Sequence, residues 1–302
     1  MPGKLGPTPV EIELNAVIVA VRDNEPCILI DPAMALPSGP FETGHRTLEQ
    51  GLRDWAEAKG GQRLGYVEQL YTFADKDRTT GHSRMVSIGY LALLRAAVLS
   101  ADAVWSPWYH HLPWEDYRDD VPRITSKIIF PGLSEWKNAS ADPLVRRTRS
   151  QRVEIAFPKD KRLWNEELVL QRYELLWEAG LVAEAQPKKE TAALGLPMAH
   201  DHRRILATAI ARLRAKIKYR PVVFELMSDT FTLLQLQNTV EALAGLRLHK
   251  QNFRRLVNAQ GLVEETGAYA AVTAGRPAKL FAFRRKVLME RAVAGTKLSR
   301  TS

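Results

Sequence analysis

The sequence has almost no cysteine and no long apolar run. Its only cysteine is Cys27, so an internal disulfide and a zinc cluster of several cysteines are both excluded. No stretch of about 18 uncharged apolar residues is present, which excludes an ordinary membrane-spanning helix. Residues 1–7 contain no apolar segment, so we expect no secretion signal. These absences favour a protein of the reducing cytoplasm.

What is present is the composition of a folded protein with an uneven charge. The 302 residues are 45% hydrophobic and 25% charged, and the length suggests two domains. Residues 200–302 hold 19 Lys and Arg against 7 Asp and Glu, a net charge of +12, whereas residues 1–199 carry −3. A basic module beside a slightly acidic one indicates a polyanionic partner, above all nucleic acid. A solvated basic face is the alternative.

Residues 8–195 are predicted to form a mixed α/β domain. Alternating apolar side chains predict a strand over 11–22, and a second, shorter strand covers 26–30. Residues 36–40 contain two prolines and a glycine and are predicted to break regular structure. A capping signal, Thr47 followed by Gln50, begins a helix that ends near residue 60. Residues 85–94 are predicted to be a buried strand.

Four tryptophans and several prolines fall within residues 105–140. This composition predicts an irregular insertion that forms a packed surface loop or an interface, with ligand stacking as the alternative. His110 and His111 lie there too, but adjacent side chains diverge and no third ligand is near, so we expect no metal site. A helix over 164–179 and a linker over 186–197 are predicted to follow.

Residues 200–288 are predicted to form a helix-turn-helix with a wing. Asp201 and Thr232 are positioned to cap two helices, and a third helix runs from about residue 250 to 259 after a short turn. Phe253, Leu256 and Val257 are predicted to form the buried face of the third helix. Residues 289–302 are predicted to be a flexible basic tail.

The other positions of the third helix are rich in hydrogen-bond donors: Lys250, Gln251, Asn252, Arg254, Arg255 and Asn258. A helix fits the DNA major groove, where Arg, Asn and Gln bond base edges and Lys or Arg holds phosphates. Arg276 and Lys279 belong to the hairpin that follows, which would be the wing. Binding of a protein partner, with these charges merely solvated, is the alternative.

Residues 36–39 and 47–60 resemble a Nudix box, the motif G-x5-E-x7-R-E-U-x-E-E-x-G-U in which U is a bulky aliphatic residue. Four positions of the box are kept: Gly39, Arg53, Glu57 and Gly60. Two acidic positions are lost, to His45 and Ala58, and a third is shortened to Asp54. In the Nudix family these acids bind Mg²⁺, which assists hydrolysis of a diphosphate. The departures imply that hydrolysis is lost or severely weakened.

Further segments resemble the NrtR-type Nudix-related transcription regulators: residues 69–78, 83–93, 164–167, 173–176, 201–202, 252–255 and 275–280. The resemblance covers most of the chain from about residue 10 to 285, with the Trp-rich insertion matched least. It implies an α/β Nudix-like sandwich fused to a winged helix-turn-helix. It also implies a homodimeric repressor of NAD biosynthesis or salvage genes, which binds a palindromic operator and senses ADP-ribose or a related nucleotide. Some relatives sense sugars instead.

The helix pattern and the resemblance together assign DNA binding to seven residues: Lys250, Gln251, Asn252, Arg254, Arg255, Arg276 and Lys279. The resemblance assigns effector binding to four: Arg53, Asp54, Glu57 and Arg84. For Arg53 a structural ion pair, and for Arg84 a solvated charge, are the alternatives. No catalytic or metal-binding residue is assigned.

Three functions remain open from the sequence. The first is a ligand-responsive repressor. The second is an active Nudix pyrophosphohydrolase of the ADP-ribose type with an accessory basic domain. The third is a nucleotide-sensing scaffold whose helical domain binds another protein.

Overall fold

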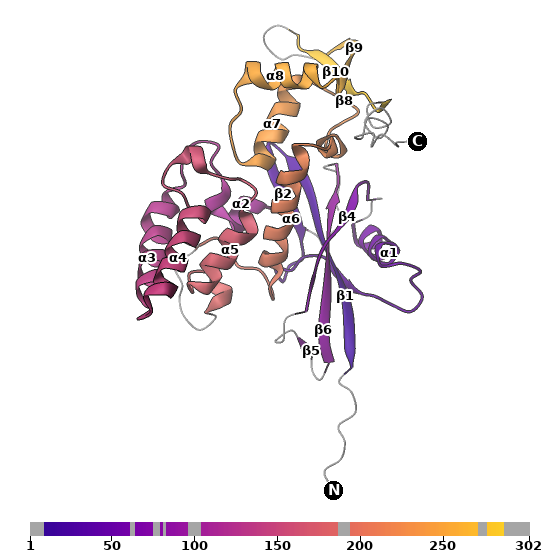
Figure 1. The fold of residues 1–302 in the computed structure, drawn as a ribbon. Coiled ribbons are helices and arrows are strands. Elements are labelled where there is room, and N and C mark those ends of the chain that lie inside the picture. The colour runs from indigo at the N-terminus through magenta and orange to yellow at the C-terminus, as the bar shows by residue number, and fades with distance from the viewer. Residues whose placement is uncertain are drawn as a thin grey trace, which may run out of the picture.

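The computed structural model describes residues 9–60, 64–74, 79–80, 83–95, 104–186, 194–270 and 277–286. A long mixed sheet runs through the molecule, with a helix on each of its faces (Figure 1). A group of further helices lies outside one face, and a small helical domain with its own short strands lies at the end of the sheet opposite the N-terminus. Among these residues no helix is long and apolar enough to cross a membrane.

The large sheet has seven strands. Five follow the order β4 (Val67–Phe73), β6 (Ser83–Leu93), β1 (Val10–Arg22), β2 (Glu25–Ile30) and β7 (Val104–Pro107), while β3 (Ser38–Pro40) pairs with β1 and β5 (Thr79–Thr80) with β6. β1 and β6 are parallel, and the other pairs are antiparallel. The expectation of broken structure over residues 36–40 was therefore partly wrong, because Ser38–Pro40 pairs along β1.

Alternation along β1 loads both faces of the sheet. Leu14 and Ile18 face α1 (Leu48–Gly60), where they join a core with Leu52. Val17 and Val19 belong to the larger core on the opposite face, which also contains the buried stripe of α6 (His202–Ile217). A strand buried on both faces reads as a nearly continuous apolar run, which explains the sequence of β1. The predicted strand over 11–22 and the predicted helices that correspond to α1 and α6 are confirmed.

The Trp-rich insertion is the main correction to the sequence prediction. It supplies β7 at the sheet edge and then short helices: α2 (Trp108–His111), a 3-10 helix (Pro113–Glu115), a π-helical turn (Thr125–Ile129) and α3 (Phe130–Asn138). Trp108 and Trp114 are fully buried in the larger core, so they are neither surface nor ligand-stacking residues. Prolines near them begin helices at positions where no backbone N–H is needed.

Other boundaries also differ from the prediction. The helix expected over 164–179 begins later, as α5 (Val169–Glu178), and α4 (Pro143–Ala156) was not foreseen. The C-terminal end of the expected linker packs against the rest of the protein. Leu194 is 2% exposed, and the Leu196 N–H donates to the carbonyl of His110. Residues 187–193 lie outside the described residues.

Three charged side chains are fully buried between the insertion and two helices. Glu115 accepts from Arg172 of α5 at 2.6 and 2.8 Å and from Arg214 of α6 at 2.6 Å, and all three side chains are 0% exposed. Arg214 also donates to the carbonyl of Leu243 at 3.0 Å. Charges removed from water need this degree of pairing and hydrogen bonding. The group therefore fixes the insertion, α5 and α6 against one another.

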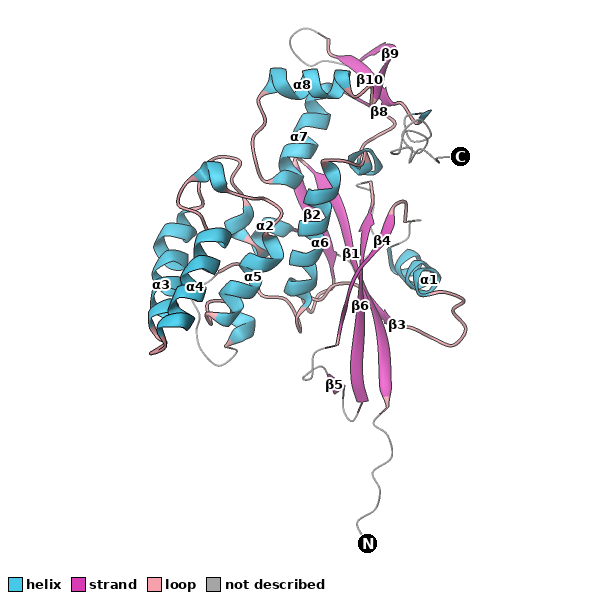
Figure 2. Cartoon of the chain, in the orientation of Figure 1, coloured by secondary structure: helices cyan, strands magenta, loops and turns pink. Residues whose placement is uncertain are grey.

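The C-terminal part is a winged helix-turn-helix (Figure 2). A 3-10 helix (Val222–Leu226) and β8 (Thr230–Phe231) precede α7 (Leu233–Ala244) and α8 (Lys250–Ala259), and β9 (Val263–Tyr269) and β10 (Lys279–Phe283) form the hairpin. The small sheet has the order β8-β10-β9. The core of this part is continuous with the larger core of the sheet.

We expect Glu115→Gln to destabilise the protein, because Arg172 and Arg214 would keep buried charges without a counter-ion. Breaking a buried ion pair from one side typically lowers the free energy of unfolding by about 3–5 kcal/mol. Urea denaturation followed by tryptophan fluorescence measures the change. Glu178→Gln is the control, because Glu178 pairs with Arg152 at the surface. Equal midpoints for the two variants would contradict a structural role for the buried carboxylate.

His111 is fully buried, and its ring nitrogens contact Ser106 Oγ at 2.9 Å and the carbonyl of Leu196 at 3.1 Å. Burial lowers the pKa of His111 to about 4. The charge of Arg203 acts in the same direction, and the hydrogen bond to Leu196 acts in the opposite one. As the pH falls through 6.5, His111 therefore takes up a proton in the unfolded chain but stays neutral in the folded protein. Stability contributed by the neutral ring is complete above that pH and falls by up to about 3 kcal/mol as the pH drops toward 4.

Urea denaturation at a series of pH values between 7 and about 4 measures this dependence. His111→Gln should flatten it, and the exposed neighbour provides the matched control, His110→Gln, which should leave it intact. A pH dependence that is the same in all three proteins would exclude His111 as its source.

Candidate functional site

The recognition-helix candidate, α8, has the bounds that the sequence predicts. Phe253 and Val257 are buried and hold the helix on the core. The predicted donors are all exposed: Lys250, Gln251, Asn252, Arg254, Arg255 and Asn258. Leu256 is 54% exposed, so its assignment to the buried face was wrong. At 100° per residue only Phe253 and Val257 point inward, and Leu256 falls on the flank of the helix.

Local sequence explains why α7 and α8 meet as they do. Thr232 caps α7 as predicted and forms a capping box with Gln235, with bonds of 2.7 and 3.1 Å between each side chain and the other's backbone N–H. Gly245 ends α7 with a φ of 70°, and a Cβ there would lie 2.4 Å from the carbonyl oxygen of Glu115. Glycine is needed for both the left-handed backbone and the close approach.

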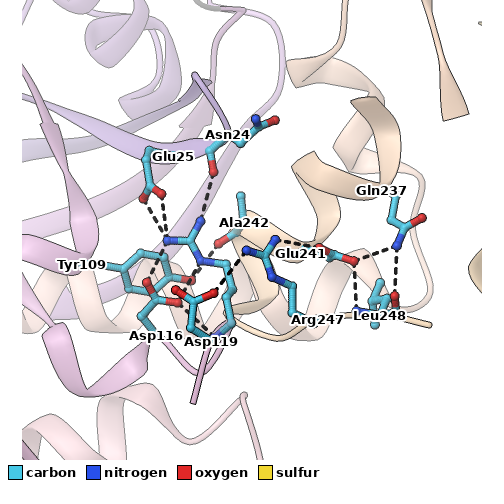
Figure 3. A network of polar contacts seen from close by, with 11 residues as sticks. Asn24, Glu25, Tyr109, Asp116, Asp119, Gln237, Glu241, Ala242, Arg247 and Leu248 are labelled. Atoms are coloured by element: carbon cyan, nitrogen blue, oxygen red, sulfur yellow. Dashed lines mark hydrogen bonds and ion pairs between the residues drawn. The ribbon is translucent and has the colours of Figure 1, made fainter. Parts of the chain in front are cut away.

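A buried carboxylate then fixes the turn between the two helices (Figure 3). Glu241 accepts from the Gln237 side chain at 2.8 Å, from the Leu248 N–H at 3.0 Å and from Arg247 at 3.0 Å. Burial opposes ionisation of Glu241, but these donors outweigh it and hold its pKa below the ordinary value. Glu241 was not among the residues predicted from the sequence.

The wing is anchored by aromatic packing. Phe281 pairs with Phe231 of β8, and the Phe283 ring stacks on Phe224 at 4.2 Å. Lys279, predicted to contact DNA, is 51% exposed and makes an ion pair with Glu265 at 2.7 Å. Arg276, the other predicted wing residue, lies outside the described residues.

Side chains of α1 contact the segments that precede and follow the helix. A Cβ on Gly39 would lie 3.0 Å from the Trp55 ring, so glycine permits that contact. Arg53 donates to the carbonyls of Leu64 at 2.6 Å and Gly65 at 3.3 Å, and Glu57 accepts from the Leu64 N–H at 3.0 Å. Both side chains thus hold the loop that follows the helix.

The other two predicted effector residues lie on exposed surface. Asp54 is exposed on α1, and Arg84 is exposed on β6 and donates to the carbonyl of Ala74 at 2.9 Å. No hydrogen bond or ion pair joins Arg84 to α1 within the described ranges. The structure therefore groups Arg53 with Glu57 and leaves Arg84 on another element.

The residues at the former acidic positions do not fit a Nudix Mg²⁺ site. His45 Nδ1 accepts the Glu42 N–H at 3.0 Å and its ring lies against Gly51, so it serves the loop. One Glu57 oxygen is engaged by Leu64, and Ala58 has no side-chain oxygen. In the described part of the chain no three or more His, Cys, Asp or Glu side chains are placed to share a metal ion.

Comparison with known proteins assigns the C-terminal part. Residues 223–290 match the sequence model of the NrtR DNA-binding winged helix domain. This segment resembles an NrtR-type winged helix. The match begins after α6, so the NrtR-type winged helix comprises the 3-10 helix, β8, α7, α8 and the wing. The predicted resemblance to the NrtR-type regulators is confirmed.

One characterised relative is the ADPR responsive transcriptional repressor NtrR of Acinetobacter baylyi. The two sequences are 42% identical over 91 residues, which are 30% of this chain and 36% of the relative. The matched region thus spans about a third of that relative's length.

Two solved structures share the fold over nearly the whole chain. Shewanella oneidensis NrtR complexed with a 27mer DNA has a TM-score of 0.57 at 20% identity, covering 92% of this chain and 95% of that one. A MutT/nudix family protein from Enterococcus faecalis has a TM-score of 0.51 at 15% identity, covering 94% and 89%. At these identities the likeness establishes the fold, a mixed α/β Nudix-like body with a C-terminal NrtR-type winged helix, as predicted.

We expect Arg53→Ala to lower the free energy of unfolding by about 1–2 kcal/mol, because two backbone carbonyls lose a charged donor. Urea denaturation measures the change. Arg46→Ala, which removes an exposed charge just before α1, is the control. If both variants unfold at the same urea concentration as the unchanged protein, the contacts of Arg53 do not hold the loop.

Proposed function

We propose that the chain is a ligand-responsive transcriptional repressor that binds operator DNA through its winged helix. The observation that carries this proposal is α8: a helix with six exposed polar donors, anchored by two buried apolar residues, within an NrtR-type winged helix. Arg255 lies 200° around the helix from both Phe253 and Val257 and points away from the core. A side chain in that position enters the major groove.

The side chains of α8 are suited to two kinds of DNA contact, with base edges and with phosphates. Gln251, Asn252 and Arg255 are of the types that bond base edges with two hydrogen bonds. Lys250 and Arg254 suit phosphate contacts, which set register and carry most of the salt dependence. The net charge of +12 over residues 200–302 supports the same assignment. Lys279 joins the contact only if a phosphate replaces Glu265 as its partner.

We further propose ADP-ribose or a related nucleotide as the effector, sensed by the Nudix-like half. The name of the relative, an ADPR responsive repressor, supports this choice. Asp54, Glu57 and Arg84 are the candidate contacts, and Arg53 acts by holding the loop at Leu64 in place. By the resemblance, the regulated genes belong to NAD biosynthesis or salvage, and the protein acts in the cytoplasm.

The proposed mechanism needs two arrangements of the molecule. A homodimer on a palindromic operator holds its two recognition helices about one DNA turn apart. An effector that binds better to the off-DNA arrangement shifts the population and releases DNA, typically with about 1–3 kcal/mol of coupling. α6 is suited to carry the change, because it covers the sheet while Arg214 bonds the end of α7.

We do not propose hydrolysis, because the residues at the acidic positions of the box, among them His45 and Ala58, do not fit a Mg²⁺ site. We expect ADP-ribose to be recovered intact after incubation with the protein and Mg²⁺. Steady turnover that disappears in Glu57→Gln would instead support the pyrophosphohydrolase.

The function is tested by binding to labelled DNA duplexes from the region upstream of the protein's own gene. Binding is measured by fluorescence anisotropy at several salt concentrations. We expect specific binding with strong salt dependence, and release by ADP-ribose in preference to NAD or simple sugars. Arg255→Ala should weaken binding by about 1–3 kcal/mol. Arg212→Ala removes an exposed arginine from α6 and should have little effect. Failure of the unchanged protein to bind any such duplex at low salt excludes the repressor.

A further inference from the structure

The turn between α7 and α8 carries an arginine that neither the helix pattern nor the resemblance singles out. Arg247 is 59% exposed and lies three residues before the first residue of α8. Two carboxylates hold its guanidinium: Glu241 at 3.0 Å, whose side chain is 5% exposed, and Asp119 at 3.4 Å, whose side chain is 96% exposed (Figure 3). The two contacts therefore differ sharply in strength and in access to solvent.

Asp119 reaches this turn from the insertion, on a loop that is fixed to the sheet. Its neighbour Arg118 donates to Asp116 at 2.7 and 2.8 Å, to Glu25 at 3.0 Å and to the carbonyl of Asn24 at 3.0 Å. Asp119 itself has only Arg247 as a partner within the described ranges. A carboxylate of the Nudix-like body is thus held against the helix-turn-helix.

Groove dimensions place Arg247 beside the DNA backbone when α8 is bound. An α-helix with its side chains is about 10–12 Å across, and the major groove is about 12 Å wide. The helix therefore fills the groove, and residues just outside its ends meet the sugar-phosphate strands. An exposed arginine three residues before the helix has the reach and the planar donor set that phosphates select.

We propose that Arg247 binds a DNA phosphate and that Asp119 competes with the phosphate for it. The proposal rests on the proposed DNA-binding function. Glu241 keeps its bond to Arg247 in both states, because that carboxylate is also held by Gln237 and Leu248. The exposed contact to Asp119 contributes little and is readily exchanged for a phosphate. Asp119 of the insertion thereby lowers the affinity of the protein for DNA.

Four variants of the full-length protein test this: Asp119→Asn, Arg247→Ala, the double variant, and Asp120→Asn as the matched control. Asp120 is the adjacent acid, and it pairs with Lys161. Operator affinity is measured by anisotropy between 50 and 300 mM salt, together with the thermal midpoint of each variant. Arg247→Gln is added, because it keeps a donor toward Glu241 while removing the charge.

We expect Asp119→Asn to tighten DNA binding about twofold to fivefold. Arg247→Ala and Arg247→Gln should weaken it about fivefold to tenfold at 0.1 M salt and reduce the slope of log K against log salt by about one. Asp119→Asn should have no effect once Arg247 is replaced, and Asp120→Asn should have none.

Unchanged affinity and slope in both Arg247 variants overturn the proposal. So does tightening by Asp119→Asn that persists without Arg247, or that Asp120→Asn reproduces, because bulk charge then accounts for it. If the unchanged protein binds no duplex at all, the proposed function fails first and this proposal falls with it. The two failures are therefore distinguishable.

Discussion

Two guanidinium groups share one carboxylate in the interior, and the arrangement of the molecule depends on this contact. Glu115 comes from the insertion, Arg172 from α5 and Arg214 from α6, so three segments meet at a single buried charge. Apolar packing would tolerate small shifts of these segments, whereas a buried charge has one set of partners that satisfies it. Backbone carbonyls and the Trp164 ring, 3.8 Å from Arg172, complete its surroundings.

This contact also decides how the winged helix is joined to the sheet. Arg214 bonds the last turn of α7, the Tyr109 hydroxyl donates to the carbonyl of Ala242 at 2.7 Å, and Gly245 lies against Glu115. The insertion therefore touches the helix-turn-helix directly, in addition to the path through α6. The helix-turn-helix is therefore joined to the sheet by two sets of contacts, one through the buried Arg214 and one along the loop at Asp119.

The elements that could be predicted are those whose signals are local. The bounds of α8, the capping box at Thr232 and the end of α7 at Gly245 follow from a few neighbouring residues. The insertion could not be predicted, because its short helices have no sustained period and its tryptophans are buried against elements far away in the sequence. Leu256 falls on the flank of α8, and its exposure depends on whether another element covers that flank.

Residue types and their spacing along single segments were enough to predict the mixed α/β class and the basic helix-turn-helix with its wing. The missing acidic ligands were implied by the resemblance to the Nudix box. Three sets of contacts could be known only from the folded chain: those of Arg53 and Glu57 with the backbone at Leu64, those of Glu241 with the turn before α8, and the ion pair of Asp119 with Arg247. These are contacts between segments far apart in the chain, or between one side chain and a distant backbone. Their energies depend on burial and on three-dimensional distance, which the order of residues does not specify.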